Sequence, residues 1–248
     1  MAYIRSTGMD SILDAGTAKS RAASEIIGFV LLFATIIILL SFWQAFIIPS
    51  ETENTESSHQ LQVENDLREL RDTIELSRQS RTNHVVGVQL GPRYGDRILF
   101  ANPPPQAGSI RTVAENSDIS ITNVTVSDGE PVGTAAFWQS SRTLSTSLLA
   151  YDVSYSELGY DPSYRLENSF LYGRFDGQLL GLTEPKWIDG TDIRLTAFSG
   201  MLSENHNREQ RIQVTSNSPA SRSVTVESDD GPVTIRFPTL LSQSEWQE

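Results

Sequence analysis

The apolar and polar positions of this chain follow three different patterns along its length. The first stretch is uncharged from Ile26 to Ser50, and its apolar part, Ile26 to Ile48, has no polar stripe. At about 1.5 Å per residue, an Ile26–Ile48 helix would be roughly 34 Å long and would cross a bilayer core of roughly 30 Å. A buried helix of a soluble domain is the alternative, but such helices are usually shorter and amphipathic. We therefore predict one membrane-spanning helix, with the lipid bilayer as its partner.

The second stretch, residues 51–82, starts polar and becomes amphipathic. Its apolar residues, spaced by four, three and four positions, are Val63, Leu67, Leu70 and Ile74. This spacing predicts one face of a helix. Glu64 with Arg68, and Arg71 with Glu75, are spaced for ion pairs on the solvated face. We expect the apolar face to dock onto the downstream domain; a coiled coil with a neighbouring subunit is the alternative.

The third stretch, residues 83–248, has short runs typical of β-strands, separated by glycine, proline and aspartate. The expected strands are His84–Leu90, Arg97–Ala101, Ser109–Ala114, Ile119–Val126, Ala135–Thr143, Leu148–Tyr155, Asn168–Phe175, Asp192–Ser199, Arg211–Thr215, Ser223–Glu227 and Val233–Phe237. The predicted fold class is therefore mainly β: a long N-terminal α-helix, first transmembrane and then amphipathic, followed by an antiparallel β-sandwich-like domain.

Two features near the C-terminus give more specific expectations. A hairpin with a tight Asp-Asp-Gly-Pro turn would place five apolar side chains on one buried face. These side chains are Val224, Val226, Val233, Ile235 and Phe237. Ser242 and Glu245 have the spacing of a capping box, which predicts a helical turn.

The basic residues around the apolar run indicate its orientation. Arg5, Lys19 and Arg21 precede it, whereas the first basic residue after it is Arg68. This asymmetry predicts a cytoplasmic N-terminus and a domain outside the cell from about Ser50 onward. The chain contains no cysteine, so that domain must be stabilised by core packing instead of disulfides.

The charged residues of the chain limit its possible partners and indicate the kind of organism from which it comes. The formal net charge is −12, and only Lys19 and Lys186 are lysines among 19 basic residues. An acidic exterior disfavours nucleic acid as a partner. An acidic, lysine-poor composition is typical of haloarchaeal proteins, because an acidic surface stays hydrated in concentrated salt.

No motif predicts an enzyme, a cofactor or a metal site. His59, His84 and His206 are far apart and lack a second ligand at metal-binding spacing, and no nucleophile elbow or phosphate-binding loop is present. Aspartates beside glycine favour hairpin turns, with calcium ligation as the alternative. These aspartates are Asp128, Asp176, Asp189, Asp192, Asp229 and Asp230.

Two other patterns have simple interpretations. The scattered aromatic residues are expected to fill a β core, with sugar binding as the alternative. They are Trp138, Phe170, Tyr172, Phe175 and Trp187. The sequence Asn-Val-Thr beginning at Asn123 fits the acceptor pattern for N-glycosylation.

The segment before the apolar run carries a resemblance. "KSRAASEIIGFVLLFATIIILL" resembles the class III signal and N-terminal helix of archaeal type IV pilin-like proteins, through Arg21-Ala22-Ala23-Ser24-Glu25 and Ile26-Ile27-Gly28. The resemblance implies that a prepilin peptidase cleaves between Ala22 and Ala23. Residues 1–22 would then be the leader and residues 23–50 the hydrophobic helix. Independently of the resemblance, the polar composition of residues 1–25 leads us to expect that this stretch is disordered or removed.

The downstream part also resembles an uncharacterised haloarchaeal family of membrane-anchored β domains. The resemblance lies in "ILFANPPPQAGSIRT", "ENSFLYGRFDGQLLG", "WIDGTDIRLTAFSG" and "SRSVTVESDDGPVTIRFPTLLSQSEW". Together the two resemblances lead us to expect a minor pilin-like subunit of a surface filament, in which Glu25 helps to set subunit register. The alternative is a monomeric anchored surface domain that binds a protein or glycan.

Overall fold

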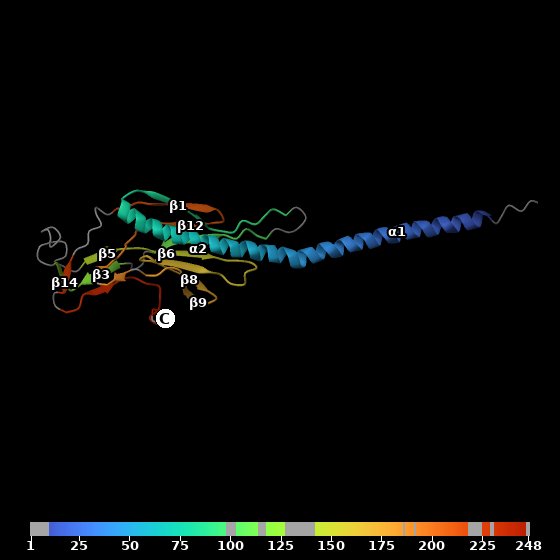
Figure 1. The fold of residues 1–248 in the computed structure, drawn as a ribbon. Coiled ribbons are helices and arrows are strands. Elements are labelled where there is room, and N and C mark those ends of the chain that lie inside the picture. Colours follow the sequence, from blue (N-terminus) through green and yellow to red (C-terminus); the bar gives the residue numbers. More distant parts are fainter. Residues whose placement is uncertain are drawn as a thin grey trace, which may run out of the picture. The chain divides into compact units, whose positions relative to one another are not determined.

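The computed structural model describes residues 10–97, 103–113, 118–126, 142–185, 187–190, 192–217, 225–228 and 231–246. The chain divides into two compact units, Met1–Glu51 and Thr52–Glu248. The fold is mainly β, with one long N-terminal helical stretch followed by antiparallel sheets (Figure 1).

The first unit is helical from Asp10 onward. α1 covers Asp10–Phe42, and a π-helical turn follows at Trp43–Ile47. Within this turn the Ile48 N–H donates to the Trp43 carbonyl, five residues back. Pro49 has no N–H, and its ring would press on the carbonyl four residues earlier, so a wider turn at this point relieves that crowding.

Residues 10–25 belong to α1, so the expectation that they are disordered is wrong; removal of the leader remains a prediction. This stretch contains several alanines and no proline, and adding a residue to an existing helix costs far less than nucleating one.

The second unit combines most of helix α2 (Ile48–Ser80) with all of the described strands. The strands are β1 (His84–Gln89), β2 (Gly108–Val113), β3 (Asp118–Thr122), β4 (Val124–Val126), β5 (Arg142–Ser145), β6 (Leu148–Val153), β7 (Ser163–Glu167), β8 (Phe170–Phe175), β9 (Gln178–Gly181), β10 (Ile188–Asp189), β11 (Asp192–Ile193), β12 (Ser203–His206), β13 (Glu209–Val214), β14 (Val226–Ser228) and β15 (Thr234–Arg236).

The largest sheet has six strands in the order β12-β2-β6-β7-β8-β9, with antiparallel pairing throughout. Smaller antiparallel pairings join β1 to β13, β10 to β11, β14 to β4, and β3 to both β15 and β5. The core lies between the six-stranded sheet and a layer formed by α2 with β1, so a helix supplies part of one layer of the sandwich-like domain. Its buried residues are Val63, Leu67, Leu70, Val86, Val88, Leu90, Ile110, Leu149, Tyr151, Val153, Tyr164, Leu166 and Leu171.

Two-residue turns connect the meander from β7 to β9. Asn168 and Ser169 join β7 to β8, and Asp176 and Gly177 join β8 to β9, all four with positive φ. Positive φ at both central residues is the backbone that two-residue hairpins prefer. The predicted Asp-Gly turn at Asp176 is therefore confirmed, whereas the expected strand Asn168–Phe175 loses its first two residues to a turn.

Several strand predictions need correction. β7, β9, β10 and β12 were not expected, and the expected strand Asp192–Ser199 shrinks to the two residues of β11. Arg97 lies outside the strands, and residues 98–102 and 135–141 lie outside the described part of the chain.

The predicted hairpin at Asp-Asp-Gly-Pro is wrong. β14 pairs with β4 and β15 pairs with β3, in the same direction along one continuous partner. The register therefore leaves five residues between β14 and β15 opposite the single residue Asn123, and we call this interruption of the pairing a bulge. Val226 is exposed. Val224, Asp229 and Asp230 lie outside the described residues.

Candidate functional site: an apolar anchor and a helix held by buried carboxylates

The apolar helix of the first unit exposes its side chains on all sides. It is long and apolar enough to span a membrane. Ile26, Phe29 and Phe46 are each more than 60% exposed, and no charged residue interrupts the stretch between them. The hydroxyl of Thr35 donates to the Leu31 carbonyl at 2.8 Å, so this polar group needs no partner outside the helix. Such a surface is stable only when lipid or protein covers it.

The residues predicted for processing and assembly lie in α1. Ala22 and Ala23 are helical, and Glu25 is exposed on the same helix. Cleavage at Ala22-Ala23 and an assembly role for Glu25 remain predictions.

One face of α2 is buried against the β domain from Thr52 to Ser77. Its residues are spaced by four, three, four, four, three, four and three positions: Thr52, Glu56, His59, Val63, Leu67, Leu70, Ile74 and Ser77. Docking onto the downstream domain is therefore confirmed, and this seam is not free to form a coiled coil. The seam is apolar from Val63 to Ile74 and polar before that.

Glu56 has no exposed surface, and its carboxylate accepts five hydrogen bonds. Oε1 accepts from the Tyr94 hydroxyl at 2.7 Å, the Ser156 hydroxyl at 2.7 Å and the Ser156 N–H at 2.9 Å. Oε2 accepts from the N–H groups of Glu157 and Leu158, both at 2.9 Å. Three consecutive backbone amides thus converge on one side chain from α2.

These hydrogen bonds keep Glu56 ionised despite its burial. Burial alone raises the pKa of the carboxyl, but the bonds from Tyr94, Ser156 and Glu157 outweigh it and lower the pKa below its usual value. Burial, followed by the bond to Glu56, raises the pKa of Tyr94, which stays a donor. The carboxylate links α2 to a loop about 100 residues later in the chain.

His59, one turn after Glu56, is a core histidine. Its Nε2 lies 3.2 Å from the Gln89 carbonyl and its Nδ1 lies 2.8 Å from the Tyr155 hydroxyl. Because a carbonyl can only accept, Nε2 carries the proton and Nδ1 accepts from Tyr155. Burial lowers the pKa of His59 to about 4, although the bond to Gln89 opposes this shift.

The ion pairs on the solvated face were only partly predicted. Glu64 and Arg68 pair at 3.6 Å, as expected. Arg71 does not pair with Glu75; it pairs with Asp72 at 2.7 Å and donates to the Ser169 carbonyl. Ser169 lies in the turn after β7, and this contact between α2 and a distant turn could not be predicted from the sequence.

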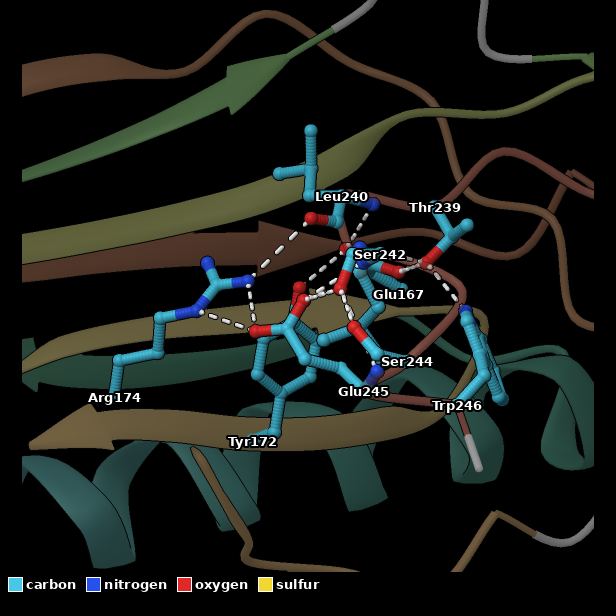
Figure 2. Close-up of polar contacts among 10 residues, drawn as sticks. Glu167, Tyr172, Arg174, Thr239, Leu240, Ser242, Ser244, Glu245 and Trp246 are labelled. Atoms are coloured by element: carbon cyan, nitrogen blue, oxygen red, sulfur yellow. Dashed lines mark hydrogen bonds and ion pairs between the residues drawn. The ribbon is translucent and has the colours of Figure 1, made fainter. Parts of the chain in front are cut away.

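A second buried carboxylate holds the C-terminal segment Phe237–Trp246, which we call the strap (Figure 2). Glu167 accepts from the hydroxyls of Tyr172 at 2.6 Å and Thr239 at 2.7 Å, and from the Leu240 N–H at 2.9 Å. It is 2% exposed, and these three donors come from β8 and the strap. Glu167 thus holds a segment that is distant in the sequence, as Glu56 holds the loop at Ser156–Leu158.

The predicted capping box at Ser242 and Glu245 is confirmed (Figure 2). Glu245 Oε2 accepts from the Ser242 N–H and hydroxyl, both at 2.7 Å, and the Glu245 N–H donates to the Ser242 hydroxyl. Arg174 pairs with Glu245 at 2.9 Å. The Ser242 bonds and then the Arg174 bond lower the pKa of Glu245 to about 2.

Aromatic rings pack the strap against the sheet. Phe170, Trp187, Phe237 and Trp246 contact one another, with centroids between 4.8 and 6.3 Å apart. The indole N–H groups of Trp187 and Trp246 already donate within the domain. These contacts agree with the predicted core role; Trp138 lies outside the described residues.

The predicted Asp-Gly turn at Asp189 is confirmed, because Asp189 ends β10, pairs with Asp192 of β11 and is followed by Gly190 with positive φ. Calcium ligation remains the alternative for the aspartates beside glycine. His206 Nε2 lies 3.2 Å from Gln210 Oε1, and His84 Nε2 lies 2.8 Å from Thr82 Oγ1. No group of three or more possible metal ligands occurs among the described residues. Asp128 lies outside them.

Asn123 lies exposed between β3 and β4, with φ of 60°. Its Nδ2 donates to the Pro232 carbonyl at 3.2 Å, inside the bulge described above. A sugar attached at Nδ2 would have to share or replace this bond. Glycosylation of Asn123 remains a prediction.

Comparison with known proteins places this chain near one archaeal protein of unassigned function. A stretch of 110 residues is 27% identical to an uncharacterised protein of Archaeoglobus fulgidus, covering 44% of this chain and 19% of that protein's length. No family model and no solved structure matches the chain.

Proposed function

We propose that this chain is a pilin-like structural subunit of an archaeal type IV pilus-like surface filament, as a minor component that serves adhesion or surface attachment. In this proposal a prepilin peptidase removes residues 1–22, the helix that follows anchors the chain in the cell membrane, and the β domain lies outside the cell. Its partners are the lipid bilayer, the peptidase and other pilin subunits.

The observation that carries the proposal is the uncharged apolar surface from Ile26 to Phe46, which is exposed along its whole length. Apolar side chains lose little when they exchange lipid contacts for contacts with identical helices. The same helix can therefore serve as a membrane anchor and as a filament core. Head-to-tail contacts that do not close into a ring would extend such an assembly into a filament.

The N-terminus of the mature protein tests the proposal. Mass spectrometry of the protein extracted from native membranes should find Ala23 as the first residue. The chain should also be found in filaments that are sheared from the cell surface. An intact leader, or absence from such filaments, would contradict the proposal.

Glu25 offers a finer test of assembly. Glu25→Ala should reduce filament yield while the chain still fractionates with membranes, because Glu25 precedes the apolar run and contributes nothing to its hydrophobicity. Unchanged filament yield would remove Glu25 from the assembly mechanism.

The second candidate function is a monomeric anchored surface domain that binds a protein or glycan. The aromatic group around the strap favours it, because Trp246 and Leu240 keep 36% and 41% of their surface exposed. An intact leader together with a monomeric chain in membranes would support this alternative over the filament.

A further inference from the structure

Helix α2 has a second stripe, on the face opposite the buried seam. Over its first turns this stripe consists of exposed residues spaced by four, three and four positions: Asn54, Ser58, Leu61 and Asn65. Positions with this spacing lie on one helix face and can form a seam with another helix. The seam buried by the domain occupies the other side, so the stripe is open.

The stripe is uncharged in a strongly acidic chain. Ser57 and Gln62, which flank it, are also exposed and uncharged. Exposed acidic residues border it at both ends: Glu51 and Glu53 come before Asn54, and Glu69 and Asp72 come after Asn65. With a net charge of −12, two copies of this chain repel each other. Close contact between them costs least where neither copy presents charge.

The side chains of the stripe suit contact with another helix. Leu61 is 59% exposed at its centre, beside the small side chain of Ser58. The Ser58 hydroxyl donates to the Asn54 carbonyl at 2.8 Å, so a neighbouring helix need not supply a partner for it. Small residues beside a leucine allow two helices to approach closely and bury apolar surface.

We propose that the Asn54–Asn65 stripe is the surface on which α2 packs against α2 of a second copy of this chain. The inference rests on the proposed assembly role and deepens it: contact between subunits extends beyond the apolar helix into three turns of polar helix. It ends where the charges begin, near Arg68.

Site-specific cross-linking tests this interface, because the chain contains no cysteine. Leu61→Cys is the probe. Leu76→Cys is the matched control, since Leu76 is the other exposed leucine of α2, at 49%, and lies among Asp72, Glu75 and Arg78. Membranes from cells expressing each full-length variant are treated with a short bismaleimide, and dimers are resolved on denaturing gels.

The proposal predicts loss of the Leu61→Cys monomer band into a dimer, while Leu76→Cys stays monomeric. Equal cross-linking of both variants, or of neither, would overturn it. As a second measure, Leu61→Glu should abolish the association and Leu76→Glu should not.

The outcome separates this interface from the filament role. If sheared filaments contain the chain but Leu61→Cys does not cross-link within them, the interface is wrong and the filament stands. If Leu61→Cys cross-links in membranes and no filament contains the chain, the interface stands as that of a membrane oligomer.

Discussion

The Glu56 carboxylate accepts a hydrogen bond of 2.7 Å from the hydroxyl of Tyr94, 38 residues further along the chain. With the amides of Ser156, Glu157 and Leu158, this bond ties the polar end of the α2 seam to two loops of the β domain. A buried carboxylate that accepts five hydrogen bonds depends on those donors to offset the cost of its burial. A change at Glu56 should therefore loosen the attachment of α2.

Glu56→Gln should lower the free energy of unfolding by about 2–4 kcal/mol, because the amide keeps the shape but points a donor at groups that donate. Thermal unfolding of the full-length chain in detergent, followed by near-ultraviolet circular dichroism, would measure this. Glu69→Gln is the control, since Glu69 is exposed on the same helix and changes at such positions usually alter stability by no more than about 0.5 kcal/mol. Equal effects of the two changes would contradict the role of Glu56.

His59 should make the domain sensitive to mild acid. Its pKa is about 4 in the folded chain, against about 6.5 when unfolded, so the unfolded chain takes up the proton first. Stability is then complete above pH 6.5 and falls as the pH drops toward 4, by roughly 3 kcal/mol. Glu56 adds a further loss of stability at lower pH, because its pKa is lowered in the folded chain and the carboxylate takes up a proton as the pH falls through that lowered pKa.

His59→Gln should flatten the stability profile between pH 6.5 and 4, because glutamine can donate to Gln89 without titrating. Urea unfolding at several pH values would show it. His206→Gln is the control, since His206 is partly exposed. A slope unchanged in His59→Gln would assign the acid sensitivity to other groups.

Leu67→Ala should cost about 2–5 kcal/mol, because Leu67 is 1% exposed within the core between α2 and the sheet. Leu61→Ala, on the opposite face of the same helix, should change the stability of the detergent-solubilised monomer by no more than about 0.5 kcal/mol. Denaturant unfolding of both variants compares the two faces directly. A small effect at Leu67 would mean that α2 is not docked by this face.

Gly108→Ala should destabilise the domain by at least about 3 kcal/mol. A Cβ at Gly108 would collide with the Leu90 carbonyl and lie 2.7 Å from the Tyr151 hydroxyl, which itself donates to that carbonyl at 2.6 Å. Gly200→Ala is the control, because nothing lies within 4 Å of the added carbon. Similar melting temperatures for the two variants would contradict the close approach of β1 and β2.

The sequence predicted the parts of this fold that depend on local periodicity. The spacing of Val63, Leu67 and Leu70 identified the docked face of α2, and the capping-box spacing identified the turn at Ser242. Extending the same spacing backward from Val63 reaches His59, Glu56 and Thr52. The spacing therefore placed these three residues on the docked face, but we did not expect polar side chains to be buried there.

Other features had no local signal. The donors to Glu56 lie 38 residues away at Tyr94 and about 100 residues away at Ser156, Glu157 and Leu158, and Glu167 binds a segment more than 70 residues later. The alternating apolar residues near Val226 indicated two strands but not the strands they pair with. We therefore predicted a hairpin, whereas β14 pairs with β4 and β15 with β3. The turn at Asn168 and Ser169 contains no glycine, and its positive φ values follow from the pairing of β7 with β8.

The central claim is that one helix anchors the chain and the β domain lies outside the cell. Met201 is fully exposed and the chain has no cysteine, so Met201→Cys places a single reactive thiol on the domain. The measurement is the labelling of this variant in intact cells by a maleimide that cannot cross membranes. The account predicts as much labelling as in lysed cells; labelling only after lysis would contradict it.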